Sequence, residues 1–465
     1  MVYISGYRHG PADADGSQDI EAVVTAYNSS GVRQWVAEYG SSGDDFGNSV
    51  AADSTGVYLA GTESVPRNSS SSSSSDGGSS SISDTDDTDA FVVKYNSTGS
   101  VLWKTSWGTS EPDLGNGVAV DDGSGRVYVV GTTRGSMSSD NAGERGGSSE
   151  AGPAGTTIPT DAAGATNSVP RNAGMSDVFL TCLNAADGEI QWTRQFGSSA
   201  ADVGNRIAVG PRGGVFLVGQ HGDDGDSSLA APRAFLAKYD YLGNAQFTAR
   251  LNSSSTHYAV DLAPSVGSGG EGVVYMSGYT LGDSPSVFMA RFDGSTGTQM
   301  WISHLGEEKG MPHLAQSVAV VEGSQDGFSR AVGGAAEGAS PGSDAEAESP
   351  VVEGAEARAG SDTRIVVVGY NMSMASADSH SSTGFTAAAD TNGEWVWCST
   401  FERTERQTAI AIGAGGGSGQ AGSSGGESFA YIVGTVAASE ASPGNYLFLD
   451  IQKVVRQGPQ PRRRW

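Results

Sequence analysis

The sequence predicts an all-β protein, and three observations make a β-propeller the expected architecture. A short apolar signature that ends in Gly recurs seven times, three other apolar segments keep step with it, and no stretch shows a sustained helical period. The segments are rich in Val, Phe, Tyr and Trp and are bounded by Gly, Asn, Asp or Ser, which are strand and turn signals. A four-stranded sheet cannot bury both of its faces alone, so radially repeated neighbours must supply the core.

The signature is two β-favouring residues, two more residues that are mostly apolar, and a glycine, and four of its copies begin Val-Tyr. We expect it to form the second strand of each blade. Its copies are Val2–Gly6, Val57–Gly61, Val127–Gly131, Val215–Gly219, Val274–Gly278, Ile365–Gly369 and Ala430–Gly434.

Three further segments complete each repeat. The predicted third strands are Ala22–Tyr27, Ala90–Tyr95, Val178–Leu183, Ala234–Tyr239, Val287–Phe292, Gly384–Asp390 and Tyr446–Gln452. The predicted outermost strands centre on an aromatic residue, namely Trp35, Trp103, Trp192, Phe247, Trp301 and Trp395 or Trp397. The predicted innermost strands are short and made of small apolar residues, at Asn48–Ala52, Asn116–Val120, Asn205–Val209, Tyr258–Leu262, Gln316–Val320 and Thr408–Ile412.

One repeat resembles a known family. Its motifs are Asp89-Ala90-Phe91-Val92-Val93-Lys94-Tyr95, Leu102-Trp103, Gly108, Asp113, Gly115, Val118-Ala119-Val120-Asp121 and Val127-Tyr128-Val129-Val130-Gly131. This stretch is similar to an SBBP repeat, a family named for a seven-bladed β-propeller. Weaker copies cover most of the chain outside its inserts, and the copy at 384–434 is the most degenerate. The resemblance implies an architecture and no particular chemistry.

The domain prediction follows from the repeats. We expect one propeller over residues 1–456, with seven four-stranded blades and six as the alternative count. The chain begins in a second strand and ends near a third strand, as a fragment would. Four low-complexity inserts rich in Ser and Gly interrupt the blades, and a Pro- and Arg-containing tail at 457–465 is expected to be unpaired. The inserts are 62–88, 132–176, 322–363 and 413–428.

The charge and composition of the chain exclude some classes of binding partner. The net charge of −26 argues against nucleic acid and against an anionic membrane surface, because both need Lys and Arg. No apolar run is long enough to span a bilayer. We expect a monomer that binds a protein or a glycan. The sequence does not define the compartment, but N-x-[ST] sequons, including those at Asn28 and Asn96, mildly favour an extracellular or exported protein. Because the chain begins inside a repeat, a targeting signal upstream of it is compatible with this expectation.

The most regular polar motif is Asp-x-Gly-Asn, which precedes three predicted innermost strands at Asp45, Asp113 and Asp202. The preferred interpretation is structural, because Asp and Asn side chains hydrogen-bond turn backbone and because a ligand site usually breaks repeat symmetry. The alternative is a calcium site, in which these three carboxylates and Asp44 form an acidic rim.

The other acidic loops, the histidines and the cysteines give weaker sequence evidence for a metal site. The acidic loop Asp13–Asp19 lacks the Gly and Glu of an EF-hand, and Asp84–Asp89 and Asp223–Asp226 are expected to be solvated. The six histidines form no zinc-binding pattern. The two cysteines, Cys182 and Cys398, are expected to be buried thiols.

The tryptophans Trp35, Trp103, Trp192 and Trp301 recur in register, which favours packing between blades over a sugar platform. No G-x-S-x-G elbow stands between a strand and a helix, and no P-loop is present. The sequence therefore favours a non-enzymatic interaction module. The alternatives are a calcium-stabilised extracellular or glycan-binding propeller and a quinoprotein-like oxidoreductase, although the chain has no vicinal cysteines.

Overall fold

The structure is a computed structural model with two compact units. Unit 1 comprises Met1–Asp283 and Arg291–Met300, and unit 2 comprises Ser284–Ala290 and Trp301–Trp465. The structure describes residues 1–10, 19–28, 31–41, 43–65, 87–137, 174–222, 232–252, 256–265, 272–281, 286–305, 313–321, 328–331, 363–372, 382–401, 412–415, 428–436 and 446–457.

The described residues form seven antiparallel sheets, one with three strands and six with four. The first five sheets along the chain are β1(Val2–His9)-β2(Ile20–Tyr27)-β3(Arg33–Tyr39), β4(Phe46–Ala52)-β5(Val57–Ser64)-β6(Thr88–Tyr95)-β7(Val101–Trp107), β8(Asp113–Asp121)-β9(Arg126–Thr133)-β10(Asp177–Asn184)-β11(Ile190–Phe196), β12(Val203–Val209)-β13(Val215–His221)-β14(Arg233–Tyr239)-β15(Ala245–Arg250) and β16(Thr256–Ser265)-β17(Val273–Leu281)-β18(Ser286–Asp293)-β19(Gln299–Leu305).

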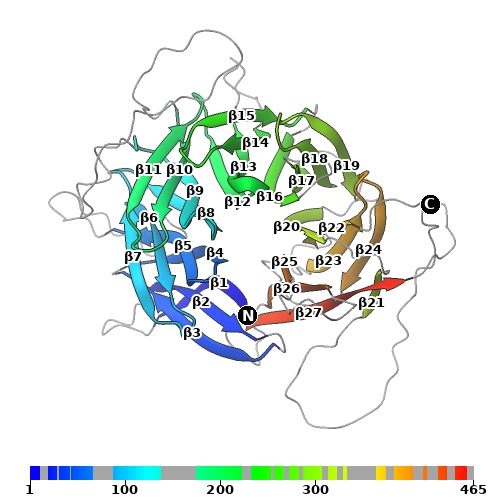
Figure 1. Cartoon of the computed structure of the whole chain (residues 1–465), viewed down its shortest axis with the longest axis horizontal. Helices are drawn as coiled ribbons and strands as arrows, with labels where there is room; N and C mark the ends of the chain where they lie inside the picture. Colours follow the sequence, from blue (N-terminus) through cyan, green and yellow to red (C-terminus); the bar gives the residue numbers. More distant parts are fainter. Residues whose placement is uncertain are drawn as a thin grey trace. The chain divides into compact units, whose positions relative to one another are not determined.

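The remaining two sheets are β20(His313–Val321)-β22(Arg364–Met372)-β23(Ser382–Ala389)-β24(Trp395–Phe401) and β21(Phe328–Ala331)-β27(Tyr446–Gln457)-β26(Ser428–Val436)-β25(Ile412–Gly415). The single helical element of the described residues is the 3-10 turn Pro211–Gly213 (η1). Consecutive strands are neighbours in nearly every sheet, so each sheet is a blade, and the predicted all-β propeller is confirmed (Figure 1). No helix of this described part could cross a membrane.

In four blades the inner strand beside it explains the Gly that ends the signature. In the second blade Gly61 pairs with Gly47, and a Cβ on Gly61 would lie 1.8 Å from the carbonyl oxygen of Phe46. In the third blade a Cβ on Gly131 would lie 2.0 Å from the carbonyl oxygen of Leu114. Real Cβ atoms cannot approach so closely, so only glycine fits at this point of the repeat.

The core of unit 1 lies between neighbouring blades. The signature tyrosines Tyr58 and Tyr128 are fully buried, and so are Phe91 and Phe179 of the third strands. One cluster joins Tyr58 and Val92 of the second blade to Val129 and Phe179 of the third. The sheet faces that pack against neighbouring blades are therefore buried, whereas the outermost strand of each blade stays partly exposed.

Each of the four outer-strand tryptophans bonds the next blade. Their indole Nε1 atoms donate to carbonyl oxygens of the following hairpin turn, over 2.9 to 3.3 Å, in the pairs Trp35–Ser97, Trp103–Ala185, Trp192–Tyr241 and Trp301–Thr391. A glycine with positive φ lies against the ring in the same turn, for example Gly99 against Trp35. The ring therefore covers the turn rather than presenting a free face to solvent.

Several boundaries differ from prediction. The third insert contains β21, which pairs with β27 as the fourth strand of the last blade, so 322–363 is not entirely loop. The same pairing reaches Gln457, which was expected to be unpaired. The inner strand β25 begins at Ile412, where the prediction ended, and occupies the start of the fourth insert. Strand residues also replace the predicted ends of the first two inserts, because β5, β6 and β9 run further than the apolar pattern does.

Candidate ligand-binding site

The aspartates of the Asp-x-Gly-Asn motif close the loops that lead into the innermost strands. Asp45, Asp113 and Asp202 are each fully buried. Each carboxylate accepts hydrogen bonds from the backbone N–H and the hydroxyl of the residue four positions earlier, in the pairs Ser41–Asp45, Thr109–Asp113 and Ser198–Asp202. The three hydroxyl bonds measure 2.8 to 3.0 Å. The three carboxylates thus serve three separate loops.

Two of these carboxyls hold their protons more tightly than usual. Burial raises the pKa of Asp45 to about 6. Burial, together with the nearby charge of Asp89, raises the pKa of Asp113 to about 7. The loss of hydration disfavours the ionised form more than the hydrogen bonds of the loop favour it.

The predicted cation rim gains no geometric support from the described residues. Among them no group of three or more His, Cys, Asp or Glu side chains could hold a metal ion. Asp44 accepts from the backbone N–H of Ile20 over 2.9 Å. Most of the loop Asp13–Asp19, the acidic run at 84–86 and the loop Asp223–Asp226 lie outside the described residues.

The asparagines of the same motif stand at β-bulges. The ladder between the first two strands skips Asn48, Asn116 and Asn205, and at the equivalent position of the next blade it skips Val260. A bulged residue is unpaired, so its side chain is free to reach outside its own sheet.

Each bulged asparagine bonds the following blade. Asn48 Nδ2 donates to Gly115 O over 2.9 Å, and Asn116 Nδ2 donates to Gly204 O over 2.8 Å. Asn205 donates in the same way to Ala259 O over 2.6 Å. A carbonyl oxygen only accepts, so these contacts also fix which amide atom is nitrogen.

A cavity of 640 Å³ opens beside these bulges in unit 1. It is lined by Asn48, Pro112, Leu114, Asn116, Thr132, Arg134, Ser176, Val203, Asn205, Arg206 and Val260. The inner strands β4, β8, β12 and β16, which supply much of this lining, lie along the inner edge of unit 1 (Figure 1). Its volume is in the range of small-molecule sites, and polar side chains converge on it.

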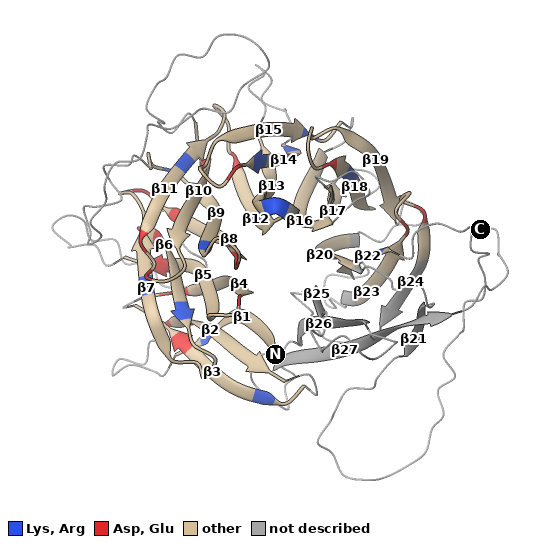
Figure 2. Cartoon of the chain, viewed as in Figure 1, with Lys and Arg blue, Asp and Glu red and all other residues tan. Residues whose placement is uncertain are grey.

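The charge of this lining is unlike that of the chain. Arg134 and Arg206 contribute guanidinium groups, and the described lining includes no Asp or Glu side chain. Arg206 Nη1 donates to Asn116 O over 2.7 Å and to Asn205 O over 3.2 Å, which holds the side chain along the bulges. In the part of the chain that the structure describes, the ribbon of Figure 2 shows the Lys and Arg positions as separate blue segments.

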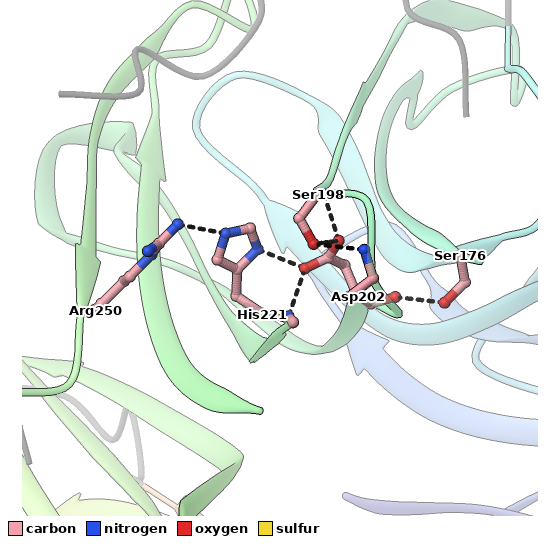
Figure 3. Close-up of polar contacts among 7 residues, drawn as sticks. Ser176, Ser198, Asp202, His221 and Arg250 are labelled. Carbon is pink, nitrogen blue, oxygen red and sulfur yellow. Dashed lines mark hydrogen bonds and ion pairs between the residues drawn. The ribbon is translucent and has the colours of Figure 1, made fainter. Parts of the chain in front are cut away.

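A polar cluster lies at the loop that follows the third blade. Figure 3 shows His221 between Asp202 and Arg250. His221 Nδ1 contacts Asp202 Oδ1, and Arg250 Nη2 lies 2.5 Å from His221 Nε2. An arginine can only donate, so Nε2 accepts in this contact and Nδ1 is the nitrogen that donates to Asp202.

This cluster contains Ser, Asp and His but is not arranged as a catalytic triad. Ser198 Oγ donates to Asp202 over 2.8 Å, and Arg250 occupies the histidine nitrogen that a nucleophile would need. Ser176 Oγ donates to the backbone oxygen of Asp202 over 3.1 Å. Neither Ser176 nor Ser198 therefore contacts the histidine in the way that the nucleophile of such a triad would.

Sequence reasoning missed the arginines of the cavity. Arg206 follows the bulged Asn205, at a position held by Ser49, Gly117 and Asp261 in three other blades. A charged side chain at a position that is small or acidic in the other repeats was the sequence signal that could have identified Arg206 as a candidate binding residue. Arg134 stands just after β9, at the edge of a predicted insert, where no pattern marks it.

No protein-family profile matches the chain, and no curated protein is similar to it in sequence. Among solved structures it is similar to a protein of unknown function from Dyadobacter fermentans, at 8% identity and a TM-score of 0.45 over 88% of this chain and 94% of that one. It is also similar to the β-propeller domain of the trilobed protease from Pyrococcus furiosus, at 8% identity and a TM-score of 0.43 over 96% and 89% of the two chains. Similarity to Trypanosoma rangeli sialidase has 10% identity and a TM-score of 0.39, over 93% of this chain and 56% of that one.

Proposed function

We propose that the chain is a non-enzymatic binding module that takes its ligand, a glycan or a segment of a protein, into the cavity beside the inner-strand bulges. The cavity is the observation that carries this proposal. It has the volume of a small-molecule site, and its lining combines amide, hydroxyl and guanidinium groups with Pro112, Leu114 and Val260.

The absence of a catalytic arrangement in the polar cluster supports binding over turnover. Ser198 and His221 both bond Asp202 and do not bond each other in the contacts of the described residues. Such an arrangement orders a loop and offers no activated nucleophile.

The experiment is a thermal-shift screen of the whole chain against neutral sugars, sugar acids, amino acids and short peptides. A ligand that binds only the folded state raises the melting temperature, and the rise grows as its concentration exceeds its dissociation constant. Val260→Trp would place a bulky ring in part of the cavity, since Val260 is bulged and lines it. We expect this variant to fold and to lose the response.

Val101→Trp is the matched control, because Val101 is 55% exposed on β7 and takes no part in the cavity lining. It should respond as the unaltered chain does. The proposal fails if no member of the panel raises the melting temperature, if Val260→Trp responds as strongly as the control, or if the protein converts a panel member to product.

A further inference from the structure

The geometry points to a hydroxylated small acid as the ligand of this cavity: a molecule with a carboxylate or phosphate group for Arg206 and with hydroxyl groups for the asparagines. The inference rests on the proposed function and names its ligand class. Three features of the described residues lead to it, namely the donors of Arg206, the acceptors of the asparagines and the exclusion of carboxylates.

The first feature is Arg206. Its Nη1 is used by two backbone carbonyl oxygens, while its Nε and Nη2 have no acceptor among the described residues. The residue is half-buried on β12, so the guanidinium is held in place and partly dehydrated. A fixed guanidinium with unused N–H groups matches the planar, bidentate geometry of a carboxylate or phosphate.

The second feature is the set of amide oxygens. Asn116 Nδ2 donates to Gly204 O over 2.8 Å and to Thr132 Oγ1 over 3.3 Å, so both amide hydrogens are used. The same holds for Asn48 and Asn205 with their own partners. Their Oδ1 atoms have no donor among the described residues. Three acceptors beside a cavity suit the hydroxyl groups of a ligand.

The third feature is the sign of the charge. A chain of net charge −26 places two arginines and no carboxylate side chain in the described lining. Amide oxygens could also bind a cation, but the positive charges of the guanidinium groups in the same lining repel one. The charge of the lining therefore disfavours cations. In this respect the cavity differs from the loops that contain the buried aspartates.

The test compares four sugars that share one ring: glucuronate, glucose 6-phosphate, glucose and glucosamine. Isothermal titration of the whole chain measures each affinity. We expect glucuronate or glucose 6-phosphate to bind about tenfold or more tightly than glucose, because a charge-assisted bidentate contact is worth at least that factor. The two acids distinguish a carboxylate from a phosphate ligand. Glucosamine should bind no more tightly than glucose.

Arg206→Met should weaken binding of the preferred acid by about tenfold or more and weaken binding of glucose by a smaller factor. Arg33→Met is the control, because Arg33 is exposed on β3 and its substitution changes the net charge by the same amount. Circular dichroism establishes that both variants fold, and Arg206→Gln replaces Arg206→Met if the latter does not fold.

Equal binding of glucose and the acids, tighter binding of glucosamine, or equal losses in Arg206→Met and Arg33→Met would overturn the assignment of an acid. Loss of neutral-ligand binding in Val260→Trp would still support a binding module. If none of the four sugars binds but another member of the panel binds in the cavity, this inference is overturned and the proposed function stands.

Discussion

His221 donates from Nδ1 to the buried carboxylate of Asp202, while Arg250 faces the other nitrogen of the ring. The pair joins the end of β13 to the loop that enters β12. At the equivalent point of the second blade the backbone N–H of Ser64 contacts Asp45 over 3.2 Å. The histidine thus adds a side-chain contact to a recurring backbone one.

His221→Ala should destabilise the chain by about 1–3 kcal/mol, because it removes a donor from a buried carboxylate. Asp202 would keep its bonds from Ser198 and Gly222. Arg250→Ala, at an exposed position, should cost about 1 kcal/mol or less. Urea unfolding of both variants measures the difference, and equal costs would show that the Asp202 contact is not the source of stability.

Asp113→Asn should change how stability depends on pH. Because the folded-state pKa of Asp113 is raised to about 7, above the usual value of about 4, the neutral carboxyl stabilises the fold. This contribution is full below pH about 4 and is lost as the pH rises through about 7, with about 4 kcal/mol as its upper bound. The asparagine variant should lack that decline.

Unfolding free energies measured from pH 4.5 to pH 8, roughly the span of this titration, check the prediction. Glu111→Gln is the control, since Glu111 is exposed in the same loop. Parallel curves for the aspartate variant and the unaltered chain would contradict the proposed burial effect.

Gly188→Ala should be more destabilising than Gly125→Ala. Both glycines have positive φ, +79° and +64°, so a side chain costs about 1–2 kcal/mol at either. A Cβ on Gly188 would also lie 2.5 Å from Trp103 Cε3, whereas nothing lies within 4 Å of a Cβ on Gly125. The clash should add about 1–3 kcal/mol. Thermal melts of the two variants give the comparison, and equal melting temperatures would argue against tight packing of Trp103 on the turn.

The two cysteines should differ in reactivity. Cys182 is fully buried, and burial raises the pKa of its thiol to about 12, so it forms almost no thiolate at neutral pH. Cys398 is exposed, contrary to the prediction that both thiols are buried. A thiol reagent should label one site in the native chain and two in denaturant, and Cys398→Ser should abolish the native label. Labelling of Cys182 in the native state would contradict its burial.

Calcium should leave the melting temperature unchanged. The carboxylates of Asp45, Asp113 and Asp202 accept hydrogen bonds within their own loops, so an ion would have to displace those donors. Melts with calcium and with a chelator provide the measurement. A rise with calcium that is lost in Asp45→Asn or Asp113→Asn would instead support the acidic rim.

Most strands could be predicted because their signals are local. The signature Val127–Gly131 carries its β-branched and aromatic residues, its partner spacing and its glycine within a few positions. Strand β21 could not, because a four-residue segment has little propensity of its own and is ordered by pairing with β27, which is distant in sequence.

The sequence by itself determined the repeat, the blade strands and the residue types that fill the interior, because alternation and turn chemistry act over a few neighbouring residues. Only the tertiary structure decided which side chains meet. Arg134, at the end of β9, and Arg206, after a bulge of β12, line one cavity with Asn48 of β4. That meeting depends on how successive blades stack, and no local pattern encodes the stacking.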